Sequence, residues 1–212
     1  MKKIAIFGSG GFGIEVYFML IDLIKNDNSF NYHFIGFFDD KIISTSYGPY
    51  LGGINELNAF SDELNILIGI GNPKILKIVT DKISNKNIIF PNIIHPSCKF
   101  IGEDTFNIGK GNIILTGCTI SCNVIIGNFN IMNTNVILGH DVKTESFNVF
   151  SPNALISGNV IIGSQNFFGF NSGVIQGRKI GNNNVIGAGS TLLRNINNEG
   201  TYIGVPAQKI KI

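Results

Sequence analysis

Apolar residues recur at every sixth position over a long central stretch, residues 108–192. An amphipathic helix repeats about every 3.6 residues and a half-buried strand every second residue, so neither explains this pattern. A fixed six-residue period predicts a parallel β-helix, in which each short strand stacks on the equivalent strand of the next coil. Fourteen of the fifteen positions are apolar and only Thr144 is polar; they are Ile108, Ile114, Ile120, Ile126, Met132, Leu138, Thr144, Phe150, Ile156, Ile162, Phe168, Val174, Ile180, Ile186 and Leu192.

The first 90 residues follow a different pattern, in which short apolar runs alternate with helical stretches. Strands are expected at 4–7, 33–38, 64–68 and 88–90, and helices at about 14–25, 56–60 and 73–84. This alternation predicts a Rossmann-like α/β lobe with a parallel sheet. We therefore expect two domains, a nucleotide-binding lobe over residues 1–90 and a β-helix with a C-terminal cap over residues 91–212.

The candidate nucleotide site lies where the predicted strands of this lobe end. Gly8 to Gly13 reads G-x-G-x-x-G between a strand and a helix, the context of the dinucleotide fingerprint. Glycines let the backbone approach a ligand, and a helix N-terminus offers free N–H groups to a phosphate. The lobe is about half of a full dinucleotide domain, which favours a mononucleotide or sugar nucleotide over NAD. The candidate residues are Gly8, Ser9, Gly10, Asp39, Asp40, Gly69, Gly71 and Asn72, with Phe37 or Phe38 expected to stack on a base.

Composition restricts the class of protein. The chain has 212 residues, 44% apolar and 14% charged, so it can bury a core. A net charge of +2 with scattered basic residues does not suggest nucleic acid as a partner. No apolar run is long enough to span a membrane, and no secretion signal is evident, so we expect a cytoplasmic protein. The three cysteines, Cys98, Cys118 and Cys122, do not supply a tetrahedral metal site, and no metal is expected.

His140 is the strongest candidate for a catalytic residue. It follows the inward position Leu138 by two residues, so its ring is expected to face outward from the β-helix. An imidazole titrates near neutrality and suits proton removal from an amine or hydroxyl. The adjacent Asp141 could hold one ring nitrogen and leave the other free as an acceptor.

The whole chain resembles the hexapeptide-repeat acetyltransferases, whose coils form a left-handed β-helix. The glycine-rich lobe, the repeat, the His140-Asp141 pair and the ending Gly204-Val-Pro-Ala207 are similar to one group of these proteins. That group comprises bacterial enzymes that N-acetylate nucleotide-linked 4-amino-4,6-dideoxy sugars, and related sialic acid O-acetyltransferases. The resemblance implies acetyl-CoA as co-substrate, a homotrimer that binds it between neighbouring β-helices, and a role in surface polysaccharides such as lipopolysaccharide O-antigen. A UDP- or dTDP-linked sugar is favoured as acceptor.

The same resemblance assigns roles to individual residues. It implies that His140 is the general base and Asp141 its partner, and that the Gly158 amide meets the acetyl carbonyl. The segment Gly187-Ala188-Gly189 would contact CoA. Many family members carry a second histidine nine residues after the catalytic one, where this chain has Val149.

Three other functions fit parts of the sequence. An O-acetyltransferase acting on sialic acid or another sugar would use the same fold and the same base. An NAD-dependent oxidoreductase would rest on the G-x-G-x-x-G motif alone. A non-enzymatic scaffold would bind neither acetyl-CoA nor nucleotide. Tight binding of a nucleoside diphosphate would favour the N-acetyltransferase.

Overall fold

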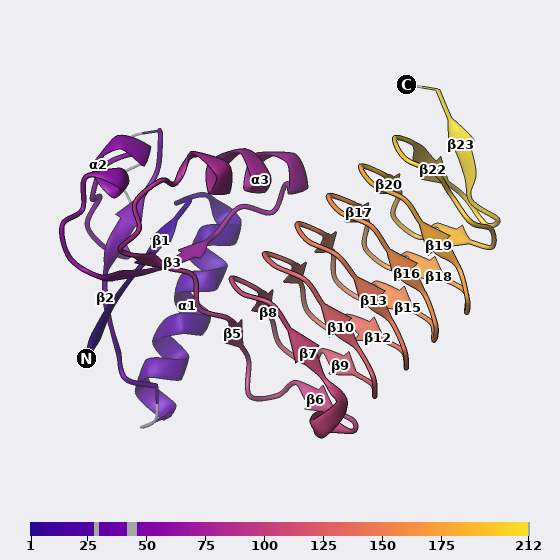
Figure 1. The fold of residues 1–212 in the computed structure, drawn as a ribbon, viewed down its shortest axis with the longest axis horizontal. Helices are drawn as coiled ribbons and strands as arrows, with labels where there is room; N and C mark the ends of the chain where they lie inside the picture. Colours follow the sequence, from indigo (N-terminus) through magenta and orange to yellow (C-terminus); the bar gives the residue numbers. More distant parts are fainter. Residues whose placement is uncertain (28–29, 42–45, 212) are drawn as a thin grey trace. The chain divides into compact units, whose positions relative to one another are not determined.

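The computed structural model describes residues 1–27, 30–41 and 46–211, which form two compact units with a boundary between Ile93 and Ile94. The first unit is an α/β domain and the second is a parallel β-helix, so the predicted fold class is confirmed (Figure 1).

The first unit contains a four-stranded parallel sheet in the order β2-β1-β3-β4. All of β3 is buried, and β1 is buried from Ile4 onward, as expected for central strands of a parallel sheet that is covered on both faces. The first helix starts at Gly11, three residues earlier than expected, since Gly10 is still extended and serves as its N-cap. The elements are β1 (Lys2–Phe7), α1 (Gly11–Asn26), β2 (Tyr32–Phe38), α2 (Ile54–Asn58), β3 (Leu64–Ile68), α3 (Pro73–Lys82) and β4 (Ile88–Ile89).

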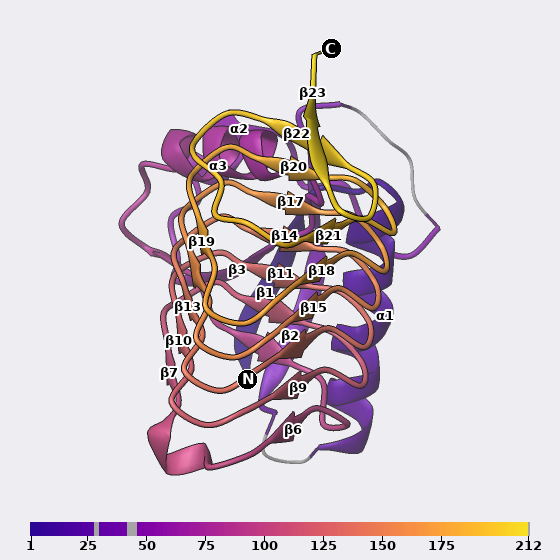
Figure 2. The same ribbon diagram turned by 90° about the vertical axis from the view of Figure 1, so that its right-hand side faces the viewer.

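The second unit winds through three parallel sheets, here called sheets I, II and III in the order in which each coil visits them. Each regular strand pairs with the strand one coil later, 18 residues along the chain, as Ile131 pairs with Val149. Figure 2 shows β11, β14, β17 and β20 of sheet I stacked in this way.

Sheet I contains β5 (Ile93–Ile94), β8 (Ile113–Ile114), β11 (Ile131–Met132), β14 (Val149–Phe150), β17 (Phe167–Phe168), β20 (Val185–Ile186), β22 (Thr201–Ile203) and β23 (Gln208–Ile210). Sheet II contains β6 (Lys99–Phe100), β9 (Thr119–Ile120), β12 (Ile137–Leu138), β15 (Leu155–Ile156), β18 (Gly173–Val174) and β21 (Thr191–Leu192). Sheet III contains β7 (Asn107–Ile108), β10 (Ile125–Ile126), β13 (Lys143–Thr144), β16 (Ile161–Ile162) and β19 (Lys179–Ile180).

The six-residue series forms the interior of the β-helix, as its period predicts. Every member from Ile114 to Leu192 is buried. Thr144 occupies an inward position too, where its hydroxyl accepts a hydrogen bond from Asn148 Nδ2 at 3.0 Å. The polar residue is therefore tolerated because a buried amide satisfies it.

A ladder of buried asparagines runs alongside this interior. Asn130 donates from its backbone N–H and its Nδ2 to Asn112 Oδ1, at 2.8 and 3.2 Å, and the same pattern repeats one coil later. The ladder consists of Asn112, Asn130, Asn148, Asn166 and Asn184. The ladder satisfies one backbone N–H in each coil that it enters. The six-residue apolar pattern of the sequence does not predict these buried hydrogen bonds.

The first coil is irregular. Lys99 pairs with Thr119, 20 residues later, and the two extra residues are accommodated by the short 3₁₀ helix η1 (Glu103–Thr105). The inward residue of this coil is Phe100, while Ile101 is 57% exposed.

The C-terminal tail forms a hairpin on the last coil. β22 pairs in parallel with β20, and β23 returns antiparallel to β22. Tyr202 and Ala207 pack against the buried cluster of the β-helix. The predicted cap is thus partly built from strands.

Candidate active site

The turns from sheet II to sheet III form one edge of the β-helix, here called the His140 edge. The residue at its tip recurs every 18 residues, so the tips stack coil by coil. Successive tips are Cys122, His140, Gly158, Gln176 and Arg194.

His140 and Asp141 form a hydrogen-bonded pair at this edge. Nδ1 of His140 lies 2.7 Å from Oδ2 of Asp141, and both side chains are about half exposed, at 50% and 47%. The ring faces outward, as expected. The pKa of Asp141 is lowered, first by the hydrogen bond from His140 and then by one from Asn123. An ionised carboxylate only accepts, so Nδ1 is the donor in this bond, and in a neutral imidazole Nε2 is then the acceptor.

Gly158 lies directly against the free side of the imidazole. A Cβ at this position would overlap Nε2 and come within 2.6 Å of Cε1. The Gly158 N–H has no acceptor among the described residues. Gly139, one coil earlier, leaves this amide uncovered, because a Cβ there would lie 2.6 Å from the Gly158 nitrogen. The edge therefore combines an imidazole acceptor with an unpaired backbone donor.

The structure does not bring every predicted cofactor residue to this edge. Gly187, Ala188 and Gly189 follow β20, in a turn from sheet I to sheet II, and so lie at a different edge of the same β-helix. Gly189 has φ +65°, and a Cβ there would meet no atom within 4 Å. Val149 lies in β14 of sheet I and is also remote in the coil from the His140 edge.

The cysteine thiols are not part of this pair, although the Cys122 carbonyl accepts a hydrogen bond from the Asp141 N–H at 3.0 Å. Cys118 is completely buried in the interior, where its pKa is raised by the neighbouring Cys98 thiol and by burial. Among the described residues no group of three His, Cys, Asp or Glu side chains could hold a metal ion.

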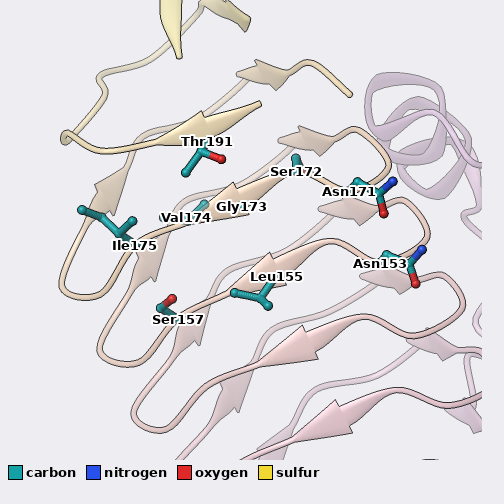
Figure 3. A pocket seen from close by; sticks show the side chains of 9 residues that line it. All are labelled: Asn153, Leu155, Ser157, Asn171, Ser172, Gly173, Val174, Ile175 and Thr191. Atoms are coloured by element: carbon teal, nitrogen blue, oxygen red, sulfur yellow. The ribbon is translucent and has the colours of Figure 1, made fainter. Parts of the chain in front are cut away.

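A hollow of about 350 Å³ lies on the outer surface of sheet II. Figure 3 shows the side chains of Leu155 and Thr191 on neighbouring strands to either side of Gly173, where no side chain fills the row. None of the residues predicted for catalysis or cofactor binding lines this hollow.

The glycine-rich loop of the first unit is tightly packed against its own backbone. Gly8 has φ +105°, a conformation that favours glycine, and its N–H donates to the Phe38 carbonyl at 2.7 Å. A Cβ on Gly13 would overlap the Gly8 carbonyl, so α1 approaches the loop only because residue 13 is glycine. The fingerprint glycines are thus required by packing as well as by any ligand.

Asp39 is tied to this loop. Its Oδ2 accepts hydrogen bonds from the Ser9 N–H and the Ser9 hydroxyl, both at 2.8 Å, and its Oδ1 accepts from the Lys41 N–H at 2.9 Å. Asp40 accepts from the Ile54 N–H at 3.0 Å. The Ser9 amide is therefore already engaged, while each carboxylate keeps lone pairs for a ligand hydroxyl.

A cavity of about 470 Å³ opens beside the loop within the first unit. Six predicted substrate residues line it: Gly8, Gly10, Asp39, Asp40, Gly69 and Gly71. Asn72 is instead the N-cap of α3, where its side chain accepts from the N–H groups of Lys74 and Ile75. Phe37 and Phe38 are 0% and 1% exposed, so the expectation that they stack on a base was wrong. Two aromatic residues line the cavity instead, Phe7, which is 2% exposed, and Phe12.

Sequence reasoning missed two residues at these sites. Phe12 sits inside the glycine motif and could have been found as its only aromatic residue. Asn123 donates from Nδ2 to Asp141 Oδ1 at 3.0 Å, and it precedes Asp141 by the 18 residues of one coil. Counting back one coil from each candidate would have found it.

Comparisons with known proteins support the two-part fold. Residues 3–83 match the PglD N-terminal domain family. The acetyltransferase domain of PglB from Neisseria gonorrhoeae, solved in complex with acetyl coenzyme A, is similar with 26% identity and a TM-score of 0.87, over 99% of both chains. No match is found among curated proteins.

Two further solved structures share the fold at lower identity. PerB from Caulobacter crescentus, in complex with CoA and GDP-perosamine, is 23% identical with a TM-score of 0.88, over 100% of this chain and 98% of that one. WeeI from Acinetobacter baumannii is 20% identical with a TM-score of 0.87, over 99% of this chain and 100% of that one. No helix within residues 1–27, 30–41 and 46–211 is both long and apolar enough to cross a membrane.

Residues 3–83 thus match the PglD N-terminal domain family, and the chain as a whole shares the fold of the PglB acetyltransferase domain and of PerB, an α/β unit followed by a parallel β-helix.

Proposed function

We propose that this protein is an acetyltransferase that moves acetyl from acetyl-CoA to the 4-amino group of a nucleotide-linked 4-amino-4,6-dideoxy sugar. The observation that carries the proposal is the His140 edge, where an imidazole held at Nδ1 by Asp141 presents Nε2 beside the unpaired Gly158 N–H. A base and an oxyanion donor side by side suit acyl transfer. The similarity to the N. gonorrhoeae domain solved with acetyl coenzyme A supports the choice of acyl donor.

The proposed acceptor is a UDP- or dTDP-linked sugar, bound by the first unit. The cavity beside the glycine-rich loop combines exposed backbone with the carboxylates of Asp39 and Asp40, which can meet ribose hydroxyls or a base edge. The complex of C. crescentus PerB with GDP-perosamine supports a nucleotide-linked amino sugar as the substrate class. Residues 1–90 are therefore assigned to nucleotide binding, and residues 91–212 to acetyl-CoA binding and catalysis.

The proposed reaction is a direct transfer. The sugar amine attacks the thioester carbonyl while His140 Nε2 accepts the amine proton, and Asp141 stabilises the resulting imidazolium. The Gly158 N–H donates to the developing oxyanion. Collapse breaks the C–S bond, and the imidazolium returns its proton to the departing CoA sulfur. The products are an N-acetyl sugar and free CoA thiol, and no covalent enzyme intermediate forms.

A homotrimer is the proposed assembly. Gly158 and the segment 187–189 lie at different edges of one β-helix, so a single extended acetyl-CoA could contact both where edges of two copies adjoin. The proposed setting is the cytoplasm, where acetyl-CoA and nucleotide sugars are made, with surface polysaccharide precursors as products.

The test is CoA thiol release from acetyl-CoA with UDP-, dTDP- and GDP-linked 4-amino-4,6-dideoxy sugars, for the wild-type protein and His140→Ala. We expect rapid release with one UDP- or dTDP-linked sugar, and loss of that release in the variant. Release only with the GDP-linked sugar would show that the preferred nucleotide is GDP rather than UDP or dTDP. Acetylation of free sialic acid alone would identify an O-acetyltransferase that uses the same base. Release undiminished in His140→Ala would refute the assigned base.

A further inference from the structure

Asn123 lies one coil before Asp141, at the same position of the His140 edge. Residues 18 apart stack on neighbouring coils here, which places the Asn123 side chain next to the carboxylate. Its Nδ2 donates to Asp141 Oδ1 at 3.0 Å. The hydrogen bond from Asn123 is the second largest cause, after that from His140, of the lowered pKa of Asp141.

The two oxygens of Asp141 are thereby divided between two partners. Oδ2 is bonded to His140 Nδ1 and Oδ1 to Asn123. A half-exposed carboxylate held at one oxygen can rotate about its terminal torsion, which is broad and roughly two-fold. A second partner on the other oxygen fixes the plane of the carboxylate, and with it the direction from which Nδ1 is held.

Asn123 is itself anchored by the irregular first coil. Its backbone N–H donates to Thr105 Oγ1 at 2.8 Å, and the Thr105 hydroxyl donates to the Gly102 carbonyl at 2.7 Å. Thr105 ends η1, the short helix that accommodates the two extra residues of that coil. The inserted turn thus holds the backbone of Asn123, and the Asn123 side chain in turn holds Asp141, which binds the imidazole.

We infer that Asn123 is a positioning residue, which holds Asp141 so that His140 stays protonated at Nδ1 and free at Nε2. The inserted turn around Thr105 serves as its support. This role rests on the proposed function only in that His140 is the base; the tautomer itself can be measured without any substrate.

The direct test is the tautomeric state of His140 in Asn123→Gly, read from ¹⁵N shifts of the imidazole at alkaline pH, where imidazoles are neutral. Asn123 has φ +57°, so glycine removes the amide without backbone strain. Asn183→Gly is the matched control, because Asn183 has φ +58° in a turn from sheet III to sheet I. With only three histidines in the chain, the spectrum can be assigned.

We expect wild type and Asn183→Gly to show the Nδ1–H form, and Asn123→Gly to show a mixture of the two tautomers. An unchanged Nδ1–H spectrum in Asn123→Gly would overturn the inference. Thr105→Val should shift the tautomer in the same direction to a smaller extent, and Thr105→Ser should restore the wild-type spectrum. These two variants decide the question if Asn123→Gly does not fold.

Kinetics give a second readout. For an active enzyme, kcat of Asn123→Gly should fall about tenfold, a part of the 10²–10⁴ that a positioned base contributes, while KM for acetyl-CoA stays unchanged. A rise in KM at constant kcat would contradict a positioning role. If wild type transfers no acetyl to any acceptor, the proposed function fails, while the tautomer measurement still decides the role of Asn123.

Discussion

Gly158→Ala is the smallest change that tests the proposed site. The added Cβ would overlap His140 Nε2, lie 2.6 Å from Cε1 and lie 2.8 Å from Cδ2. Real Cβ contacts are not this short, so either the ring or the backbone of the coil must move. The backbone on both sides is held, because Asn159 N–H donates to the His140 carbonyl at 2.7 Å and Ser157 N–H donates to Val174. The ring, half exposed and free on its outer side, is therefore the part that yields.

The displaced ring loses its hydrogen bond to Asp141, and its Nε2 no longer faces the Gly158 amide. The reaction then loses most of the contribution of a positioned base, about 10²–10⁴ in rate. We expect kcat to fall about 100-fold in the CoA thiol-release assay. The fold should persist, because the methyl group points to the exposed imidazole rather than into the interior.

Gly173→Ala is the matched control. It is another glycine of the β-helix, and a Cβ there would make only ordinary contacts with Thr191, at 3.6 and 3.8 Å. Its kcat should stay within about twofold of wild type, a change worth less than about 0.5 kcal/mol. Activity of Gly158→Ala within about threefold of wild type, in a protein of unchanged stability, would refute the geometric assignment of the site.

Three further predictions concern the fold, the pair and the nucleotide site. Asn148→Ala should lower the free energy of unfolding by about 3–5 kcal/mol in urea titrations. The substitution leaves the buried hydrogen-bond partners of the Asn148 side chain unsatisfied, at a cost of about 1–3 kcal/mol each. Asn184 lies at the end of the ladder with an unpaired Oδ1, so Asn184→Ala should cost only about 1 kcal/mol. Equal losses of unfolding free energy in the two variants would contradict a stabilising role of the ladder. Asp141 should titrate below the ordinary aspartate pKa of about 3.9 in carboxyl NMR, so the stability it contributes is present above that pH and is lost as the pH falls. In His140→Ala that pKa should rise, and an unchanged value would refute the hydrogen bond as its cause. Asp39→Ala should weaken binding of a nucleoside diphosphate in calorimetry without altering binding of CoA. If the variant bound the nucleoside diphosphate as tightly as the wild type, the glycine-rich loop would not be part of the nucleotide site.

The repeat made most of the fold predictable. A six-residue period leaves the chain little conformational freedom, because each inward position must be filled and each coil must stack on the last. All members of the six-residue series from Ile114 to Leu192 are buried, as that period requires. The α/β order of the first unit followed for a similar reason, because buried parallel strands are continuous apolar runs. The break in the period near Ile101 was visible too, but its cause was not, since the two extra residues form a turn with no apolar signal of its own.

The candidate site was predictable only in part. The outward direction of His140 followed from its place two residues after Leu138, but the rotamers that bring its Nδ1 to Asp141 Oδ2 were not fixed by the repeat, whose left-handed φ of about +60° recurs at every sixth residue. Phe37 and Phe38 were misjudged because aromatic residues next to a ligand loop serve the core equally well. Polar partners that lie one coil apart are distant in sequence, so Asn123 and the asparagine ladder escaped a reading confined to neighbours.

A β-helix converts sequence distance into spatial distance by a simple rule, and this rule has a consequence for how its active sites arise. A residue 18 positions before or after a catalytic group adjoins it, whatever its chemical type, as Asn123 adjoins Asp141 and Gly158 adjoins His140. A substitution at the tip of one coil therefore changes the environment of the neighbouring tips without disturbing the buried rows. The two extra residues of the first coil form η1, and Thr105 at its end accepts a hydrogen bond from the Asn123 N–H, so the inserted turn adjoins the site through the same coil-to-coil neighbourhood.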